Sequence, residues 1–122
     1  MKSFPLVTVV LSLAASAQPT NAPPFPTTST VATAQELNTH LAGKTFNATY
    51  ADGTRVQSRF GADGSLLASA PGFSDSGSWR VEEGKLCGSL RKVGEFCNEA
   101  RFDAGVLYLR RMNGEVVRYL PN

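Results

Sequence analysis

Few residues of this chain are charged, and side chains that usually carry catalysis or metal binding are scarce. Of 122 residues, 18% are charged, one is histidine and two are cysteine. Lys and Arg number 12 and Asp and Glu number 10, which gives a formal net charge of +2. Such a low and balanced charge excludes a charged disordered tail and an evident nucleic-acid-binding surface. The length excludes a large multidomain enzyme and allows one small domain.

The apolar run near the N-terminus is too short to span a bilayer. It covers residues 6–14, about half of the ~20 residues that a transmembrane helix needs. Lys2 precedes the run and Ala15-Ser16-Ala17 follows it, an order typical of a signal peptide. We therefore expect residues 1–17 to be removed and the protein to be exported, either periplasmic or secreted, without stable membrane insertion. Removal of Lys2 leaves 11 basic and 10 acidic residues, a net charge of +1.

Residues 18–32 follow the expected cleavage site and predict a linker. They are rich in Pro and Thr and show no apolar periodicity, which is typical of a mobile, partly extended tether. The folded domain is therefore expected over residues 33–122.

One short helix is expected at the start of this domain. Thr33 and Glu36 have the spacing of a capping box, in which each side chain accepts a hydrogen bond from the other residue's backbone N–H. Leu37 and Leu41 then share one face, and Gly43 is placed to end the helix. A helix this short must dock on another element to persist.

After Gly43 apolar residues alternate with polar ones, which indicates half-buried strands. Glycine-containing turns recur about every ten residues, so the strands are expected to be antiparallel and joined by hairpins. The fold class is therefore mainly β: a small up-and-down barrel or a strongly curved sheet of about eight strands, with the helix over one end. The predicted strands cover residues 44–50, 55–60, 65–69, 77–82, 85–90, 95–102, 106–112 and 115–120.

The large apolar side chains are enough to fill a small barrel. A barrel of eight short strands is just wide enough for its own side chains, so we expect a solid core without a roomy cavity. The residues expected to fill it are Phe46, Tyr50, Phe60, Leu66, Trp79, Leu86, Leu90, Phe96, Phe102, Leu107, Leu109, Val117 and Tyr119.

Cys87 and Cys97 are expected to form a structural disulfide, because exported proteins mature where such bonds persist. A hairpin with Lys92-Val93-Gly94 as its loop would place Cys87 opposite Glu99, so a bulge or a wider loop is needed to bring the cysteines together. We therefore predict an irregular hairpin. The pair lacks the C-x-x-C spacing of redox motifs.

No catalytic residue, cofactor or metal site is assigned from the sequence, which contains no nucleophile, zinc or nucleotide-binding motif. The lone histidine, His40, is expected to be a surface residue of the helix. Turn chemistry explains most carboxylates, including Glu115. Glu95 and Glu99 lie on one face of a strand and suggest a small hydrolase as an alternative, although pairing with a neighbouring cation is the more ordinary interpretation.

Four residues near the C-terminus predict a candidate binding surface for a sugar or an anionic group: Tyr108, Arg110, Arg118 and Tyr119. Pairing across a two-residue Asn113-Gly114 turn sets Tyr108 opposite Tyr119. The ordinary alternative is a set of solvated strand residues with one aromatic pair.

Several short segments resemble the DUF995-like family of small exported bacterial proteins of unknown function. They are residues 41–46 (LAGKTF), Asp52-Gly53, residues 78–81 (SWRV), residues 83–87 (EGKLC), Cys97, residues 106–111 (VLYLRR) and residues 117–119 (VRY). The resemblance implies an exported β-rich domain with a cysteine pair and no established catalytic residues. Phe46 stands where such proteins often carry Trp. The order of Ala42-Gly43 and Phe46 is also similar to lipocalin-like periplasmic metalloprotease inhibitors, in which a segment ahead of the barrel enters the protease cleft.

These patterns leave four functional hypotheses. The first is a non-enzymatic binding module for an unknown protein or an envelope glycan, with no nucleic-acid partner. The second is a protease inhibitor that inserts residues 18–31, and the third is a hydrolase that uses Glu95 and Glu99. The fourth is a carrier of a small apolar ligand, which needs a cavity that a solid core would not offer.

Overall fold

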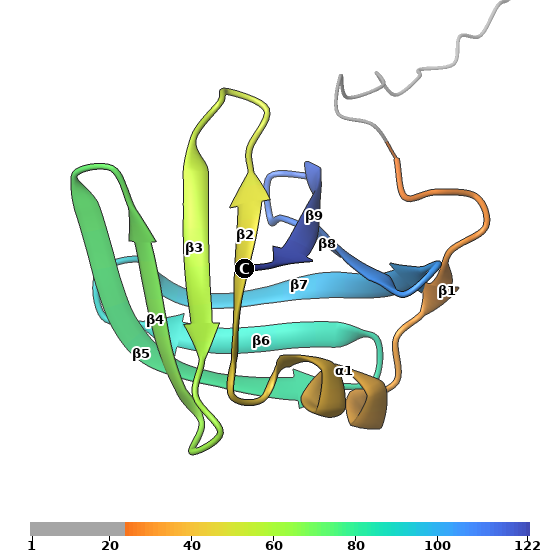
Figure 1. The fold of residues 1–122 in the computed structure, drawn as a ribbon, viewed down its shortest axis with the longest axis horizontal. Coiled ribbons are helices and arrows are strands. Elements are labelled where there is room, and N and C mark those ends of the chain that lie inside the picture. Colours follow the sequence, from red (N-terminus) through yellow and green to blue (C-terminus); the bar gives the residue numbers. More distant parts are fainter. Residues whose placement is uncertain (1–23) are drawn as a thin grey trace, which may run out of the picture.

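The computed structural model describes residues 24–122, so the expected signal peptide and the start of the expected linker lie outside the described residues. Within this part of the chain, none of the helical segments has the length and apolar character needed to cross a bilayer. The elements, shown in Figure 1, are β1 (Thr30–Val31), α1 (Ala34–Leu41), β2 (Lys44–Thr49), β3 (Arg55–Phe60), β4 (Ser65–Ala70), β5 (Phe73–Glu82), β6 (Lys85–Leu90), β7 (Gly94–Asp103), β8 (Val106–Arg110) and β9 (Val116–Pro121).

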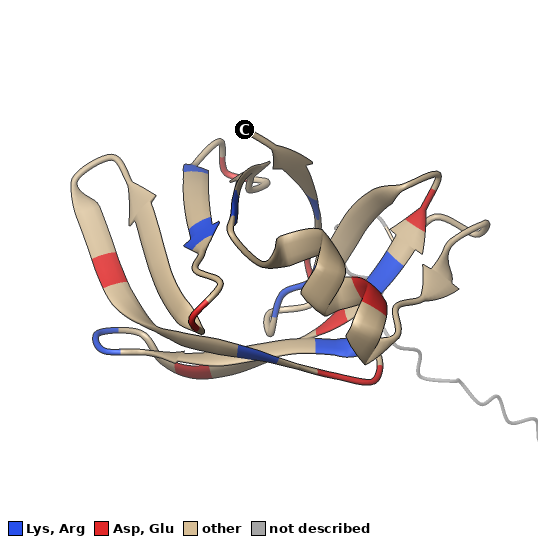
Figure 2. Ribbon diagram, turned by 60° about the horizontal axis from the view of Figure 1, so that its bottom comes forward, with Lys and Arg blue, Asp and Glu red and all other residues tan. Residues whose placement is uncertain are grey.

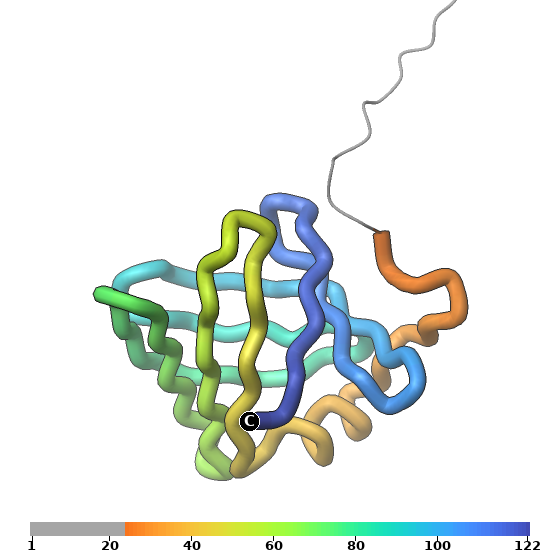
Figure 3. The backbone as a smooth tube through the Cα atoms, turned by 45° about the horizontal axis from the view of Figure 1, so that its top comes forward, coloured from red at the N-terminus to blue at the C-terminus, as the bar shows by residue number. Residues whose placement is uncertain are grey.

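The strands β2 to β9 form a closed antiparallel barrel. Each pairs with the next in sequence, and β9 returns to pair with β2 through Phe46 opposite Pro121 and Asn47 opposite Leu120. The tube view shows these two strands side by side (Figure 3). The predicted β-rich fold is confirmed, and the closed barrel replaces the alternative of an open curved sheet. Closure leaves no long free edge on the sheet.

The helix closes one end of the barrel. Thr33 and Glu36 form the predicted capping box: the Glu36 N–H donates to the Thr33 Oγ1 (3.0 Å), and the Thr33 N–H donates to the Glu36 Oε1 (2.9 Å). Leu37 and Leu41 are fully buried in the core. At the helix end, Gly43 adopts a φ of 77°, and its N–H donates to the Phe60 carbonyl at 2.7 Å.

The alternation of side chains along the strands sorts them between the interior and the outer face. Every residue that the sequence assigns to the interior is either buried or packs against the buried core. Aromatic rings form a connected group there, with the Phe46 and Phe60 centroids 6.1 Å apart and those of Phe60 and Trp79 5.4 Å apart. The Trp79 Nε1–H donates to the Gly61 carbonyl at 2.9 Å, so the buried indole has its partner.

Strand β5 begins earlier than predicted. It starts at Phe73 instead of residue 77, so Gly77 lies inside β5, between Leu66 on β4 and Leu90 on β6. A Cβ atom at position 77 would collide with the Ser89 carbonyl. This position therefore needs glycine because the neighbouring strand approaches closely. From the sequence alone, such a glycine cannot be told apart from one that forms a turn.

The cysteine hairpin is regular, and its predicted register is wrong by two residues, because the three-residue turn covers residues 91–93 instead of 92–94. Leu90 pairs with Gly94, so Cys87 lies directly opposite Cys97 without a bulge, and the two form a disulfide. Gly94, with a φ of 98°, begins β7 instead of sitting within the turn. The expected bond is present, while the expected irregular hairpin is not.

Part of the segment predicted as a linker lies on the barrel wall. In β1, Thr30 pairs with Phe102 and Val31 with Arg101, on the part of β7 that extends past its pairing with β6. Ala32 is fully buried, and its N–H donates to the Ala100 carbonyl at 3.0 Å. The Thr28 hydroxyl donates to Asp103 at 2.6 Å. The domain described by the structure therefore starts ahead of residue 33.

Candidate functional site

The barrel contains a cavity of about 460 Å³ at the end away from α1. We call this end the mouth; it is formed by the turns β2–β3, β4–β5, β6–β7 and β8–β9. The helix lies opposite the β2–β3 turn (Figure 1). The cavity is lined by Tyr50, Thr54, Val56, Ser58, Phe60, Leu66, Ala68, Ser69, Ala70, Pro71, Phe73, Leu86, Leu90, Val93, Phe96, Asn98, Leu109, Arg111, Met112, Val117 and Tyr119. The prediction of a solid core is therefore wrong.

Small inward-facing residues account for this space. Ser58 on β3 and Ala68 on β4 lie opposite each other in the register, and Ala70 follows nearer the mouth. Large predicted core residues line the cavity, but small residues between them leave the upper barrel unfilled. An eight-stranded barrel can hold one small ligand when its interior is not filled by side chains.

Several polar side chains interrupt the apolar wall, and three of them, Ser58, Asn98 and Tyr119, occupy inward positions of strands. Ser58 and Tyr119 lie inside the barrel, and burial raises the pKa of the Tyr119 phenol to about 12, so it stays neutral at physiological pH. Asn98 lines the same cavity from β7, and its side-chain oxygen is buried. No donor among residues 24–122 hydrogen-bonds to that oxygen.

Among residues 24–122, one charged residue lines the cavity: Arg111, which is already paired. Its guanidinium donates to the Glu115 Oε1 at 2.6 Å and lies 3.6 Å from the centroid of the Tyr50 ring. Glu115, only 9% exposed, also accepts a hydrogen bond from the Ala51 N–H. It is more than the ordinary turn carboxylate expected from the sequence, because it joins the β2–β3 and β8–β9 turns.

A second buried carboxylate fixes the β6–β7 turn. Asp75, 4% exposed, accepts from the Lys92 N–H at 3.0 and 2.9 Å and from the Val93 N–H at 2.9 Å. Desolvation by itself would raise the pKa of Asp75, but hydrogen bonds from the Val93, Lys92 and Ser76 N–H groups outweigh it and keep the pKa below its ordinary value. The sequence did not single out Asp75, because it lies ahead of the predicted strand at residues 77–82 and its inward position depends on the earlier start of β5.

The rim of the mouth is apolar. Met112, Val93 and Phe73 are 72%, 60% and 43% exposed; Met112 and Val93 lie in the β8–β9 and β6–β7 turns, and Phe73 is the first residue of β5, next to the β4–β5 turn. The Lys92 ammonium lies 5.4 Å from the centroid of the Phe73 ring and donates to the Ser74 carbonyl at 2.7 Å. Exposed apolar side chains around a cavity are typical of a site that receives an apolar molecule.

Comparisons with known proteins do not place this chain in a family: no protein-family model matches it, and no curated protein matches it. The resemblance to DUF995-like proteins and to lipocalin-like inhibitors stays a prediction.

The structure separates the four residues of the predicted C-terminal binding surface. Tyr108 pairs with Arg118 on the outer face, whereas Tyr119 pairs with Leu107 and faces the interior. The predicted Tyr108–Tyr119 pairing is therefore wrong. The β8–β9 turn spans residues 112–114, with the Arg111 N–H donating to the Glu115 carbonyl at 2.6 Å, so it is one residue longer than an Asn-Gly turn. One extra residue moves Tyr119 to the opposite face from Tyr108.

Arg110 is already engaged on the outer face. It donates to the Glu99 Oε1 at 2.9 Å, and its guanidinium lies 4.7 Å from the centroid of the Phe25 ring. Glu95 and Glu99 pair with Ser89 and Lys85 across the β6–β7 ladder, on the outer face and away from the barrel cavity. Figure 2 shows acidic and basic residues of both signs spread over several strands.

His40 is not the surface residue that the sequence predicts. Its ring is half-buried between Phe46, at 5.1 Å between centroids, and Phe102, at 5.0 Å. Burial, together with the nearby positive charge of Lys44, lowers the pKa of His40 below its ordinary value. Among residues 24–122, nothing hydrogen-bonds to its buried Nε2.

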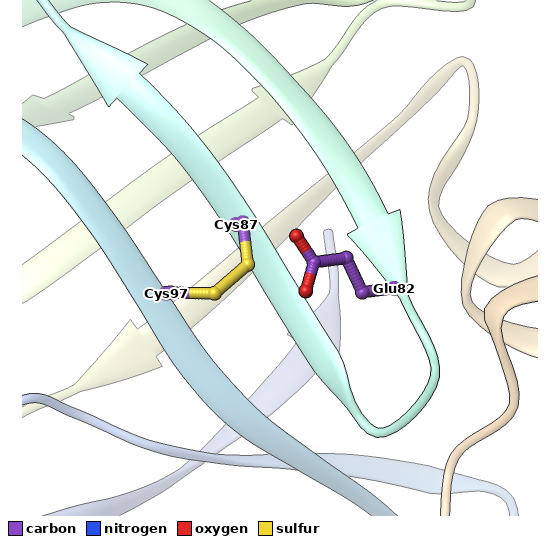
Figure 4. Close-up of side chains that lie close together, drawn as sticks. All are labelled: Glu82, Cys87 and Cys97. Atoms are coloured by element: carbon purple, nitrogen blue, oxygen red, sulfur yellow. A yellow bond between two sulfur atoms is a disulfide. The ribbon is translucent and has the colours of Figure 1, made fainter.

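Among residues 24–122, one cluster of metal-ligating residue types consists of Glu82 and the two disulfide-bonded cysteines. The Glu82 carboxylate points toward Cys87 and Cys97 on the outer face (Figure 4), and their ligand atoms lie within 4.8 Å of one another. Zinc is bound by thiolates, but both sulfur atoms take part in the disulfide. The Glu82 carboxylate is therefore the one group of this cluster that is available to a cation.

Proposed function

We propose that this protein is an exported, non-enzymatic binding module that holds a small, mainly apolar molecule in the barrel cavity. The observation that carries the proposal is the cavity of about 460 Å³, open at the mouth and lined mainly by apolar side chains. Small-molecule sites in proteins typically have volumes of ~300–1,000 Å³ and few polar groups. Of the four hypotheses raised by the sequence, the ligand carrier therefore has the strongest support.

The rim of the mouth supports the same function. Phe73, Val93 and Met112 are exposed to solvent although they are large and apolar. They extend the apolar surface of the cavity outward, so an incoming apolar molecule would leave water in steps as it enters. Asp75 and Glu115 fix two of the turns that carry this rim, which gives the mouth a defined shape.

Export is supported by the signal-peptide pattern of residues 1–17 and by the disulfide between Cys87 and Cys97. Disulfides persist in the periplasm and outside the cell and are rare in the cytosol. The hydrolase hypothesis lacks this kind of support, because Glu95 and Glu99 lie outside the cavity. The inhibitor hypothesis needs a free inserting segment, and residues 24–31 lie against the barrel wall.

Titration with the uncharged fluorescent probe phenylnaphthylamine tests the proposal. Trp79, the chain's single tryptophan, lies 5.4 Å from Phe60, which lines the cavity, so energy transfer from Trp79 reports a bound probe. We expect saturable binding with one probe per chain. Absence of binding, or binding without energy transfer from Trp79, would contradict the proposal.

Two substitutions on adjacent residues of β4 separate the cavity from the outer face. Ala68→Phe adds a ring inside the cavity, and Leu67→Phe adds one to a side chain that is 47% exposed on the outside. We expect Ala68→Phe to weaken probe binding about tenfold or more, a loss of about 1.4 kcal/mol. Leu67→Phe should leave it unchanged. Ala70→Phe, nearer the mouth, provides a second cavity-filling variant if Ala68→Phe does not fold by circular dichroism. Equal affinity in the cavity and outer-face variants would overturn the proposal.

A further inference from the structure

We propose that the molecule in the barrel cavity is an uncharged amphiphile that donates a hydrogen bond from a hydroxyl group to Asn98. This inference rests on the proposed function, because it names the ligand class of the same cavity. It is carried by two observations: the unpartnered oxygen of Asn98, and the pairing of the cavity's one charged residue.

Three buried side-chain atoms of residues 24–122 have no hydrogen-bond partner, and the Asn98 oxygen is the one that belongs to a cavity-lining residue. This Oδ1 is buried in the wall, and no N–H or O–H of residues 24–122 donates to it. A buried acceptor without a donor costs about 1–3 kcal/mol, and a ligand that donates to it relieves that cost. A hydroxyl both donates and accepts, so it satisfies the amide in either of its two orientations.

The ligand's charge is limited by the lining of the cavity. Arg111 is the one charged side chain there, and its guanidinium is held by the Glu115 carboxylate at 2.6 Å and by the face of the Tyr50 ring. A carboxylate ligand would therefore enter an apolar cavity without an available counter-ion, and an ammonium ligand would face the same cost. A neutral molecule avoids both penalties.

The rest of the cavity wall favours a ligand that is mostly apolar. Around Asn98 the cavity is formed by aliphatic and aromatic side chains, among them Leu86, Leu109 and Phe96. A medium-chain or cyclic alcohol combines such a body with one hydroxyl. Long-chain acids and quaternary amines share the body but not the neutral donor.

Displacement of phenylnaphthylamine by three matched compounds tests the inference. Decanol donates and accepts, methyl nonyl ether has the same number of heavy atoms but only accepts, and decanoate is ionised at neutral pH. We expect decanol to bind about fivefold more tightly than the ether, the gain expected for one neutral hydrogen bond. It should bind at least about tenfold more tightly than decanoate, because the latter would place an unpaired charge in the cavity.

Two variants test whether Asn98 causes the preference for decanol over the ether and whether the pairing of Arg111 causes the preference for decanol over decanoate. Asn98→Leu should bring the affinities of decanol and the ether together while the probe still binds. Glu115→Gln releases Arg111 from its carboxylate and should improve decanoate binding relative to decanol.

The outcomes keep the inference separate from the proposed function. If the protein does not bind the probe, the proposed function fails. If the probe binds but decanol and the ether displace it equally, or if Asn98→Leu keeps the preference for decanol, the hydroxyl contact is overturned. If decanoate binds as well as decanol, the restriction to uncharged ligands is overturned.

Discussion

Removal of the disulfide should cost stability without affecting ligand binding. The bond joins Cys87 and Cys97 across the β6–β7 hairpin, at a sequence separation of ten residues. In the chain-entropy treatment, closing a loop of about ten residues in the unfolded chain is worth about 2.7 kcal/mol at 25 °C. For a domain of this size, that corresponds to a fall of roughly 10–20 °C in the midpoint of thermal unfolding.

The direct measurement is urea unfolding followed by the fluorescence of Trp79. The double variant Cys87→Ala/Cys97→Ala should lose about 2–3 kcal/mol of unfolding free energy. The reduced wild-type protein is the matched control, because it loses the cross-link and keeps both sulfur atoms. Similar losses in the two samples indicate that the cross-link, and not the packing of the buried Cys87, provides the stability.

Two results would refute this reasoning. A loss below about 1 kcal/mol in both samples would mean that the bond hardly restricts the unfolded chain. A large loss of phenylnaphthylamine affinity in the folded double variant would mean that the disulfide affects the shape of the cavity. The register places the sulfur atoms on the outer face, opposite Arg80 of β5, so binding should be unchanged.

Three further predictions concern the buried and close-packed positions. Because the folded state lowers the pKa of His40, it favours neutral imidazole; the unfolding free energy should therefore fall as the pH drops below about 6.5, and His40→Gln should flatten that slope in urea titrations. An unchanged slope would contradict the buried imidazole. Asp75→Ala should speed amide hydrogen exchange at Lys92 and Val93 and leave exchange in β2 unchanged; protection equal to that of wild type would show that the carboxylate does not hold the turn. Gly77→Ala should lower the unfolding free energy by about 1–3 kcal/mol, because the added methyl group meets the Ser89 backbone; a stabilised variant would contradict the close approach.

The sequence was sufficient for features that depend on side-chain period and short spacing. Alternation of apolar and polar residues depends only on the pleat of a strand, so it identified the interior positions of the barrel. The capping box of Thr33 and Glu36 needs residues three apart and little else. The cysteine pair followed from its place on two neighbouring strands.

Features that depend on turn length were predicted less well. A turn of residues 112–114 instead of Asn113-Gly114 shifts the β8–β9 register by one position, and Tyr119 changes faces. The predicted binding surface depended on that register. The contact between Phe25 and Arg110 is also invisible in the sequence, because it joins residues that are 85 positions apart and follows no periodic pattern.

The cavity could not be predicted from the large residues alone. The number of large apolar residues suggests a filled barrel; examples are Phe46, Phe60, Trp79 and Leu86. Whether they fill it depends on which small residues meet across the interior, and that depends on the register of several strand pairs at once. Ser58 opposite Ala68 is the pair that leaves the space.

The closure of the barrel has a mechanical consequence. Two residue pairs join β2 to β9, whereas six join β2 to β3. Leu120, Pro121 and Asn122 complete this seam, with the Asn122 N–H donating to the Thr45 carbonyl at 3.0 Å. Because the β2–β9 junction has fewer paired residues than the β2–β3 junction, we expect the barrel to open between β2 and β9 more readily than between β2 and β3. Loss of those three residues would open the barrel between β2 and β9 while every hairpin stayed intact. A molecule bound in the cavity would then be able to leave through the side wall.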